Sequence, residues 1–149
     1  MSGATLLYGS RRRLIEAIKN LTPKLIITSD FNLAEASIQN DDLIHIYEDP
    51  LMLGWSLTIP QSISYIVIDL QGFTSLSRDL AVNTARRIVS IAKGLCIAGK
   101  TKLIILSPAR ARMDGFTAPA LPVHSIDDEV INLEANSSAT IHNPLKLKN

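Results

Sequence analysis

The residues best suited to chemistry lie in two short stretches, "GLCIAGKT" at 94–101 and "YGSRRR" at 8–13. The first satisfies the P-loop pattern G-x-x-x-x-G-K-[ST], in which backbone N–H groups and a lysine hold the phosphates of a nucleotide. The second combines one glycine and one serine with three consecutive arginines: Gly9, Ser10, Arg11, Arg12 and Arg13. A P-loop works only where it follows a strand and opens a helix, so the surrounding elements decide what each stretch can do.

Apolar runs and helical spacing alternate through residue 107. The runs predict strands at 4–9, 24–30, 43–49, 63–70 and 102–107, and the spacing predicts helices at 10–21, 31–40 and 75–99. Gly99 is expected to end the last helix. "GLCIAGKT" then precedes a strand instead of opening a helix, so we interpret its match as a coincidence. The alternation predicts an α/β fold with a mainly parallel sheet and helices on both faces.

The last third of the chain follows a different pattern. "PARARMDGFTAPALP" at 108–122 is rich in Pro, Ala, Gly and Arg and predicts a loop. Two extended segments, 125–135 and 139–149, flank the turn-like "NSS". They predict a C-terminal β-hairpin.

Composition indicates one domain spanning residues 1–149, because 46% hydrophobic residues suffice for one core in a chain of this length. A net charge of +1 gives no chain-wide field that favours DNA, so DNA binding would have to depend on a local cluster. A single cysteine, Cys96, fits a reducing compartment and is expected in the core. The absence of a signal-peptide pattern or a long apolar run predicts a cytoplasmic protein without a membrane span.

The three arginines stand where a phosphate loop belongs by topology, at the first strand-to-helix turn. The turn lacks the second glycine, the lysine and the Ser/Thr of a P-loop, and cations at a helix start oppose the helix dipole. Residues that oppose the usual sequence preferences of an element are typical of functional sites. Two interpretations remain open: the arginines pair with acidic residues such as Asp69 or stay in solvent, or they bind an external anion.

The order of segments resembles the RecA/RadA recombinase and KaiC family of P-loop ATPases over nearly the whole chain. "TLLYGS" resembles the strand that enters the Walker A loop, which makes Gly9 and Ser10 a degenerate Walker A position. "YIVIDLQGFTSLSRD" resembles the Walker B strand, with Asp69 in the metal-associated position. "KLIILSPARARMDGFTAPALPVHSIDDEVINLEA" resembles the next strand, the flexible DNA-binding loop and the closing β-hairpin.

The resemblance implies a RecA-like three-layer core without a separate N-terminal or DNA-binding domain. Asp30 is an imperfect substitute for the catalytic glutamate of that family, and Asp69 lacks the Ser/Thr and triphosphate that would share a magnesium ion. We therefore expect no ATPase activity, no cofactor and no metal. His45, His124 and His142 also lack the spacing of metal ligands.

The same resemblance places the strand ending at Gly9 beside the one ending at Ser107. The expected DNA-binding residues would then meet at one edge of the sheet: Arg11, Arg12, Arg13, Arg110, Arg112 and Phe116. Phe116 could stack on a base or pack on the core.

Two functions follow from this pattern. The first is a non-catalytic paralogue that binds DNA, including single-stranded DNA, without ATP and assists a catalytic recombinase in recombination or repair. The alternative is a structural or regulatory docking subunit, as a homodimer or heteromer, whose arginines face an acidic protein surface.

Overall fold

Strands and helices alternate along the chain in a computed structural model that describes residues 3–55, 57–60 and 62–134. The described strands are β1 (Thr5–Gly9), β2 (Lys24–Thr28), β3 (Leu43–Ile46), β4 (Tyr65–Asp69), β5 (Lys102–Ala111), β6 (Thr117–Pro119) and β7 (Glu129–Asn132). The α-helices are α1 (Arg11–Ile18), α2 (Phe31–Ser37) and α3 (Arg78–Gly99), and short 3₁₀ turns span Pro50–Trp55 and Gln71–Ser75.

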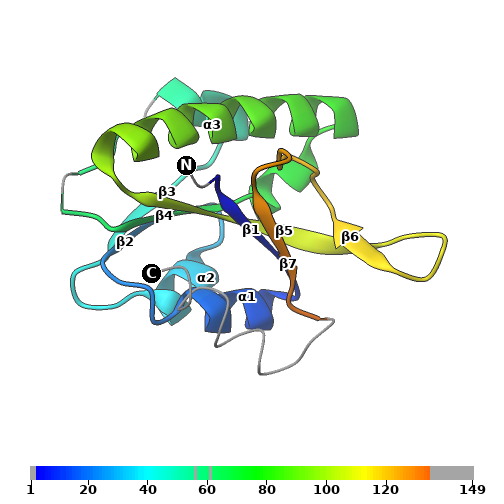
Figure 1. Cartoon of the computed structure of the whole chain (residues 1–149), viewed down its shortest axis with the longest axis horizontal. Helices are drawn as coiled ribbons and strands as arrows, with labels where there is room; N and C mark the ends of the chain where they lie inside the picture. The colour runs from blue at the N-terminus through cyan, green and yellow to red at the C-terminus, as the bar shows by residue number, and fades with distance from the viewer. Residues whose placement is uncertain (1–2, 56, 61, 135–149) are drawn as a thin grey trace.

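The strands form a seven-stranded, mostly parallel sheet in the order β3-β2-β4-β5-β1-β7, and β6 pairs antiparallel with β5. Helix α3 covers one face, and α1 and α2 cover the other (Figure 1). Both faces are therefore buried, which explains why β1 and β2 are buried throughout. The predicted α/β class, with helices on both faces of a mainly parallel sheet, is confirmed.

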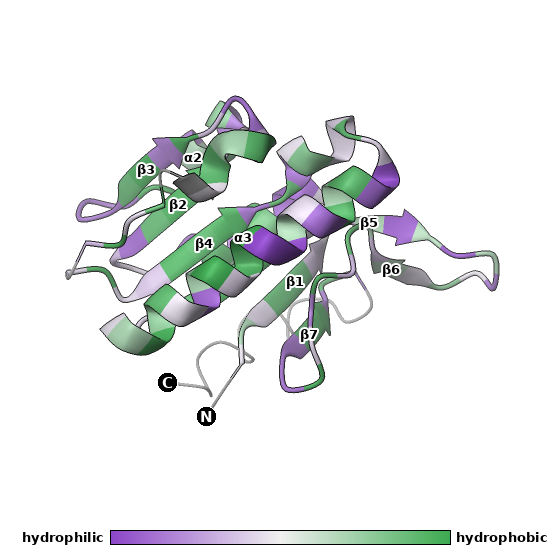
Figure 2. Ribbon diagram, turned by 90° about the horizontal axis from the view of Figure 1, so that it is seen from above, coloured by the Kyte–Doolittle hydropathy of each residue, from purple (hydrophilic) through white to green (hydrophobic). Residues whose placement is uncertain are grey.

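Strand alternation divides the apolar residues into two cores. Ile66 and Ile68 of β4 belong to the core that contains Ile88 of α3, whereas Val67 belongs to the core that contains Leu14 of α1. In Figure 2, α3 crosses above the apolar β4 and β1. Cys96 lies buried in the α3 core, as predicted.

The prediction of a loop at 108–122 is wrong. Strand β5 continues to Ala111, and the chain returns as β6, which pairs Ala109 with Pro119 and Ala111 with Thr117. Gly115 provides the turn with a φ of +88°, and the Arg112 N–H donates to the Phe116 carbonyl at 2.7 Å. Proline and glycine mark the base and tip of this hairpin; they do not mark a loop.

The predicted C-terminal hairpin also needs correction. Its first segment contains β7, but β7 joins the sheet parallel to β1. Its second segment, 139–149, lies outside the described residues.

The start and end of the long helix differ from prediction by a few residues. The 3₁₀ turn Gln71–Ser75 precedes α3, which begins at Arg78. Gly99 is still helical, and the left-handed residue that ends the helix is Lys100, with a φ of +58°. "GLCIAGKT" therefore does end a helix and lead into β5, as predicted.

Candidate functional site

The carboxyl ends of the parallel strands form the edge where an α/β fold binds ligands. The chain leaves β2 for α2 on one face and leaves the neighbouring β4 for α3 on the other, so the two connections diverge at these strand ends (Figure 1). Such a point is where ligands bind in this class of sheet. Asp69 ends β4 and Asp30 follows β2, so both residues lie where the connections diverge.

The Arg11 side chain is bound to both carboxylates. Its Nη1 and Nη2 donate to the two oxygens of Asp69 at 2.9 and 2.7 Å, and Nη2 donates to Asp30 Oδ2 at 2.9 Å. Asp69 is completely buried, and Thr28 Oγ1 donates to its Oδ2 at 2.6 Å. The predicted pairing of an arginine with Asp69 is confirmed. An internal cation thus neutralises the carboxylate that resembles the Walker B aspartate.

Asp30 has a second role as the N-cap of α2, where its Oδ1 accepts hydrogen bonds from the N–H groups of Asn32 and Leu33. Burial raises the pKa of Asp30, but the hydrogen bonds from Arg11 and the Leu33 N–H outweigh it and hold the pKa below its ordinary value. Burial lowers the pKa of Arg11. The hydrogen bonds from Arg11 to Asp69 and Asp30 outweigh burial, so the pKa of Arg11 lies above its ordinary value. Arg11 and Asp30 are therefore both charged at neutral pH.

A carboxylate also occupies the start of α1. Ser10 is the N-cap, and its own N–H donates to Glu134 Oε1 at 2.8 Å. Glu134 Oε2 lies 3.3 Å from Arg13 Nε, and Arg13 Nη1 donates to the Leu133 carbonyl at 3.4 Å. The hydrogen bonds from Ser10 are the main reason that the pKa of Glu134 is lowered. Sequence reasoning missed Glu134, because nothing in a local pattern indicates a partner more than a hundred residues away.

Arg12 is the remaining arginine of the three. Its side chain is exposed, and no hydrogen bond or ion pair joins it to another of the described side chains. Of the three consecutive arginines, Arg12 alone therefore keeps its full hydrogen-bonding capacity for an external anion.

The other predicted DNA-binding residues lie on the β5–β6 hairpin, which projects from the sheet (Figures 1 and 2). Arg110 is exposed, and Arg112 is exposed but paired with Asp114 at 2.7 Å. Phe116 is 69% exposed, so the expectation that it could pack on the core is wrong. Met113 beside it is fully exposed.

The hairpin and the start of α1 share the carboxyl edge. The predicted neighbour relation is confirmed, because Gly9 of β1 is in register with Pro108 of β5. The hairpin is also tied to β7, because Asn132 Nδ2 donates to Thr117 Oγ1 at 3.0 Å. The sheet therefore positions Arg12 and the hairpin residues on one side of the molecule.

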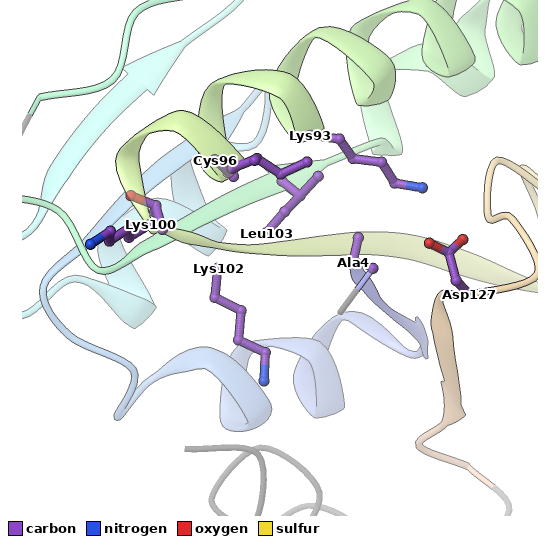
Figure 3. A pocket seen from close by; sticks show the side chains of 10 residues that line it. Ala4, Lys93, Cys96, Lys100, Lys102, Leu103 and Asp127 are labelled. Carbon is purple, nitrogen blue, oxygen red and sulfur yellow. The ribbon is translucent and has the colours of Figure 1, made fainter. Parts of the chain in front are cut away.

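A pocket of about 430 Å³ lies at the opposite edge, below the last turn of α3 (Figure 3). Ala4, Cys96 and Leu103 give it apolar walls, and burial raises the pKa of the Cys96 thiol to about 11. Its three lysines, Lys93, Lys100 and Lys102, point in different directions and do not converge on one ligand position (Figure 3). The pocket also lies at the carbonyl end of α3, where the helix dipole disfavours a phosphate. The "GKT" residues of the P-loop pattern thus lack a phosphate-binding arrangement.

A scan against protein-family models finds no match, and no curated protein matches this sequence. Within residues 3–134, leaving aside positions 56 and 61, no helix has the length and apolar character needed to cross a membrane. The same part of the chain holds no group of three or more His, Cys, Asp or Glu side chains placed to bind a metal. His142 lies outside it.

Proposed function

We propose that this chain is a non-catalytic, RecA-like paralogue that binds DNA without ATP, through Arg12 and the β5–β6 hairpin. The observation that carries the proposal is the exposure of Arg110, Arg112 and Phe116 on a projecting hairpin at the edge that bears Arg12. Guanidinium groups can follow the phosphates of a strand while an aromatic ring stacks on a base, worth about 1–3 kcal/mol per base. This combination favours single-stranded DNA, whose bases are free to stack.

Independence from ATP is supported by the internal partners at the same edge. Asp69 is bound by Arg11, and the start of α1 is occupied by Glu134. A nucleotide with magnesium would need a carboxylate free to orient the metal and backbone N–H groups free to hold phosphate. Here Arg11 binds the carboxylate, and side chains of the chain itself accept hydrogen bonds from the N–H groups of Ser10 and Arg13. Arg11 accordingly belongs to the fold in this proposal and not to the DNA contacts.

The expected partner is a catalytic RecA/RadA-type recombinase, which this chain would assist in recombination or repair. This part of the proposal is supported by the resemblance in segment order and by the pairing of β1 with β5 that the resemblance implies. Cytoplasmic location stays a prediction from the sequence.

A second candidate function, as a docking subunit, is favoured by a different observation. At the β3 end of the sheet, α2 and β3 expose four large apolar side chains: Phe31, Ile38, Leu43 and Ile46. Several large apolar side chains exposed at one end of a sheet are a feature of protein-binding surfaces. In this case the partner would be a protein or a second copy of the chain, and DNA would not be bound by the hairpin.

The test is fluorescence anisotropy of a labelled single-stranded oligonucleotide with the double variant Arg12→Glu/Arg110→Glu. Because two phosphate contacts are lost and replaced by repulsion, we expect affinity to fall by roughly tenfold or more. The control Lys19→Glu/Lys100→Glu makes the same charge change at exposed positions of the opposite edge and should weaken binding far less. Equal losses in the two variants, or no binding by the wild type, would exclude the proposed surface.

A further inference from the structure

The contact between Glu134 and Arg13 can open without disturbing a buried side chain. Its side chain is 37% exposed, and that of its partner Arg13 is 29% exposed. The pair of Arg11 and Asp69 differs, since Asp69 is completely buried and also accepts a hydrogen bond from Thr28. Removing Arg11 from Asp69 would leave a buried charge without its cation, whereas Glu134 and Arg13 can both turn into water.

The carboxylate of Glu134 is held as a phosphate would be held. One oxygen accepts from a backbone N–H, that of Ser10, and the other faces the guanidinium of Arg13. Arg12 adds to the positive field there and helps to lower the pKa of Glu134. A DNA backbone phosphate carries one negative charge shared by two oxygens, as a carboxylate does, and it bonds strongly to the planar guanidinium. An arriving phosphate therefore competes for the same donors.

We propose that Glu134 is an internal phosphate mimic that restrains the DNA-binding edge by occupying Arg13 until DNA phosphate displaces it. This inference rests on the proposed DNA-binding function and specifies how that surface is regulated. It assigns Arg13 a different role from Arg12: Arg12 meets DNA first, and Arg13 joins once the Glu134 side chain swings away. Glu134 follows β7, which ends at Asn132, so the restraint lies just beyond the end of that strand.

The variant Glu134→Gln tests this idea, because it removes the charge and keeps a side-chain oxygen for the Ser10 N–H. We expect Glu134→Gln to bind the single-stranded oligonucleotide about threefold to fivefold more tightly than the wild type, the gain from releasing one exposed ion pair. The slope of log K against log salt should be the same in Glu134→Gln and the wild type, since Arg13 meets one phosphate in both complexes. Glu35→Gln, at an exposed position of α2, is the control for the loss of one negative charge.

A double-mutant cycle with Arg13→Gln separates competition from general charge effects. In the Arg13→Gln background, Glu134→Gln should increase DNA affinity no more than Glu35→Gln does, because the Arg13 cation that Glu134 would occupy is absent. The inference is overturned if Glu134→Gln and Glu35→Gln behave alike while Arg12→Glu/Arg110→Glu still weakens binding; the proposed function then survives without it. If the wild type and Glu134→Gln both fail to bind DNA, the proposed function falls and the inference with it. Thermal melts of each variant confirm that it is folded.

Discussion

The arginines at the start of α1 and those on the β5–β6 hairpin are similar in sequence but have different surroundings. Arg11 and Arg13 each reach a carboxylate that the sheet brings to them from a distant part of the chain. On the hairpin, Arg112 pairs with Asp114, which lies on the same exposed turn. The role of a cationic run thus depends on the acids that the fold places beside it, and the run alone does not define a binding patch.

The largest difference between the two regions should appear in stability. Arg11→Ala leaves Asp69 charged and buried without its cation, so we expect a loss of about 3 kcal/mol in the free energy of unfolding. Arg112→Ala breaks an exposed pair and should cost about 0.5 kcal/mol or less. Urea denaturation of both variants measures this contrast. Similar small losses would mean that Arg11 is not a structural cation.

The second largest difference between the two regions should appear in how the stability of the chain depends on pH. Because the pKa of Asp30 in the folded chain lies below its ordinary value of 3.8, its pairing with Arg11 contributes fully above about pH 4 and is lost as the pH falls through the lower, folded-state pKa. Asp30→Asn should therefore lower the melting temperature at neutral pH and make it less dependent on pH below 4.

The matched substitution on the hairpin, Asp114→Asn, should leave the wild-type dependence of melting temperature on pH in place, because its ion pair is exposed. If the melting temperature of Asp30→Asn fell in acid as steeply as that of the wild type, this carboxylate would not belong to the Arg11 network.

The smallest expected effect concerns the end of α3, far from either arginine group. Lys100 adopts a left-handed conformation that glycine takes without strain, so Lys100→Gly should stabilise the chain by about 0.5–1 kcal/mol. DNA affinity should change much less than in Arg12→Glu/Arg110→Glu, since Lys100 lies at the opposite edge. Loss of stability in this variant, seen in a thermal melt, would show that the helix does not end as described.

The sequence was sufficient to predict the α/β class, the parallel core and the end of the long helix at "GLCIAGKT", because buried parallel strands and amphipathic helices leave strong local patterns. The pairing of an arginine with Asp69 was also predictable as one of two interpretations, since both groups lie at the carboxyl edge of the expected parallel sheet. The hairpin was not predictable: Pro108 and Gly115 are typical of loops, and the pairing of Ala111 with Thr117 depends on register. Glu134 was missed for a related reason, because its contact arises only when β7 pairs with β1.

The central claim is that DNA is bound by exposed arginines of one edge without nucleotide. The most direct test is the affinity of the wild-type chain for a single-stranded oligonucleotide over a series of salt concentrations, with and without Mg²⁺–ATP. With Arg12, Arg13, Arg110 and Arg112 each meeting one phosphate, we predict a slope of log K against log salt of about −3 that is unchanged by ATP. Binding that requires ATP, or that does not weaken as salt rises, would contradict the account.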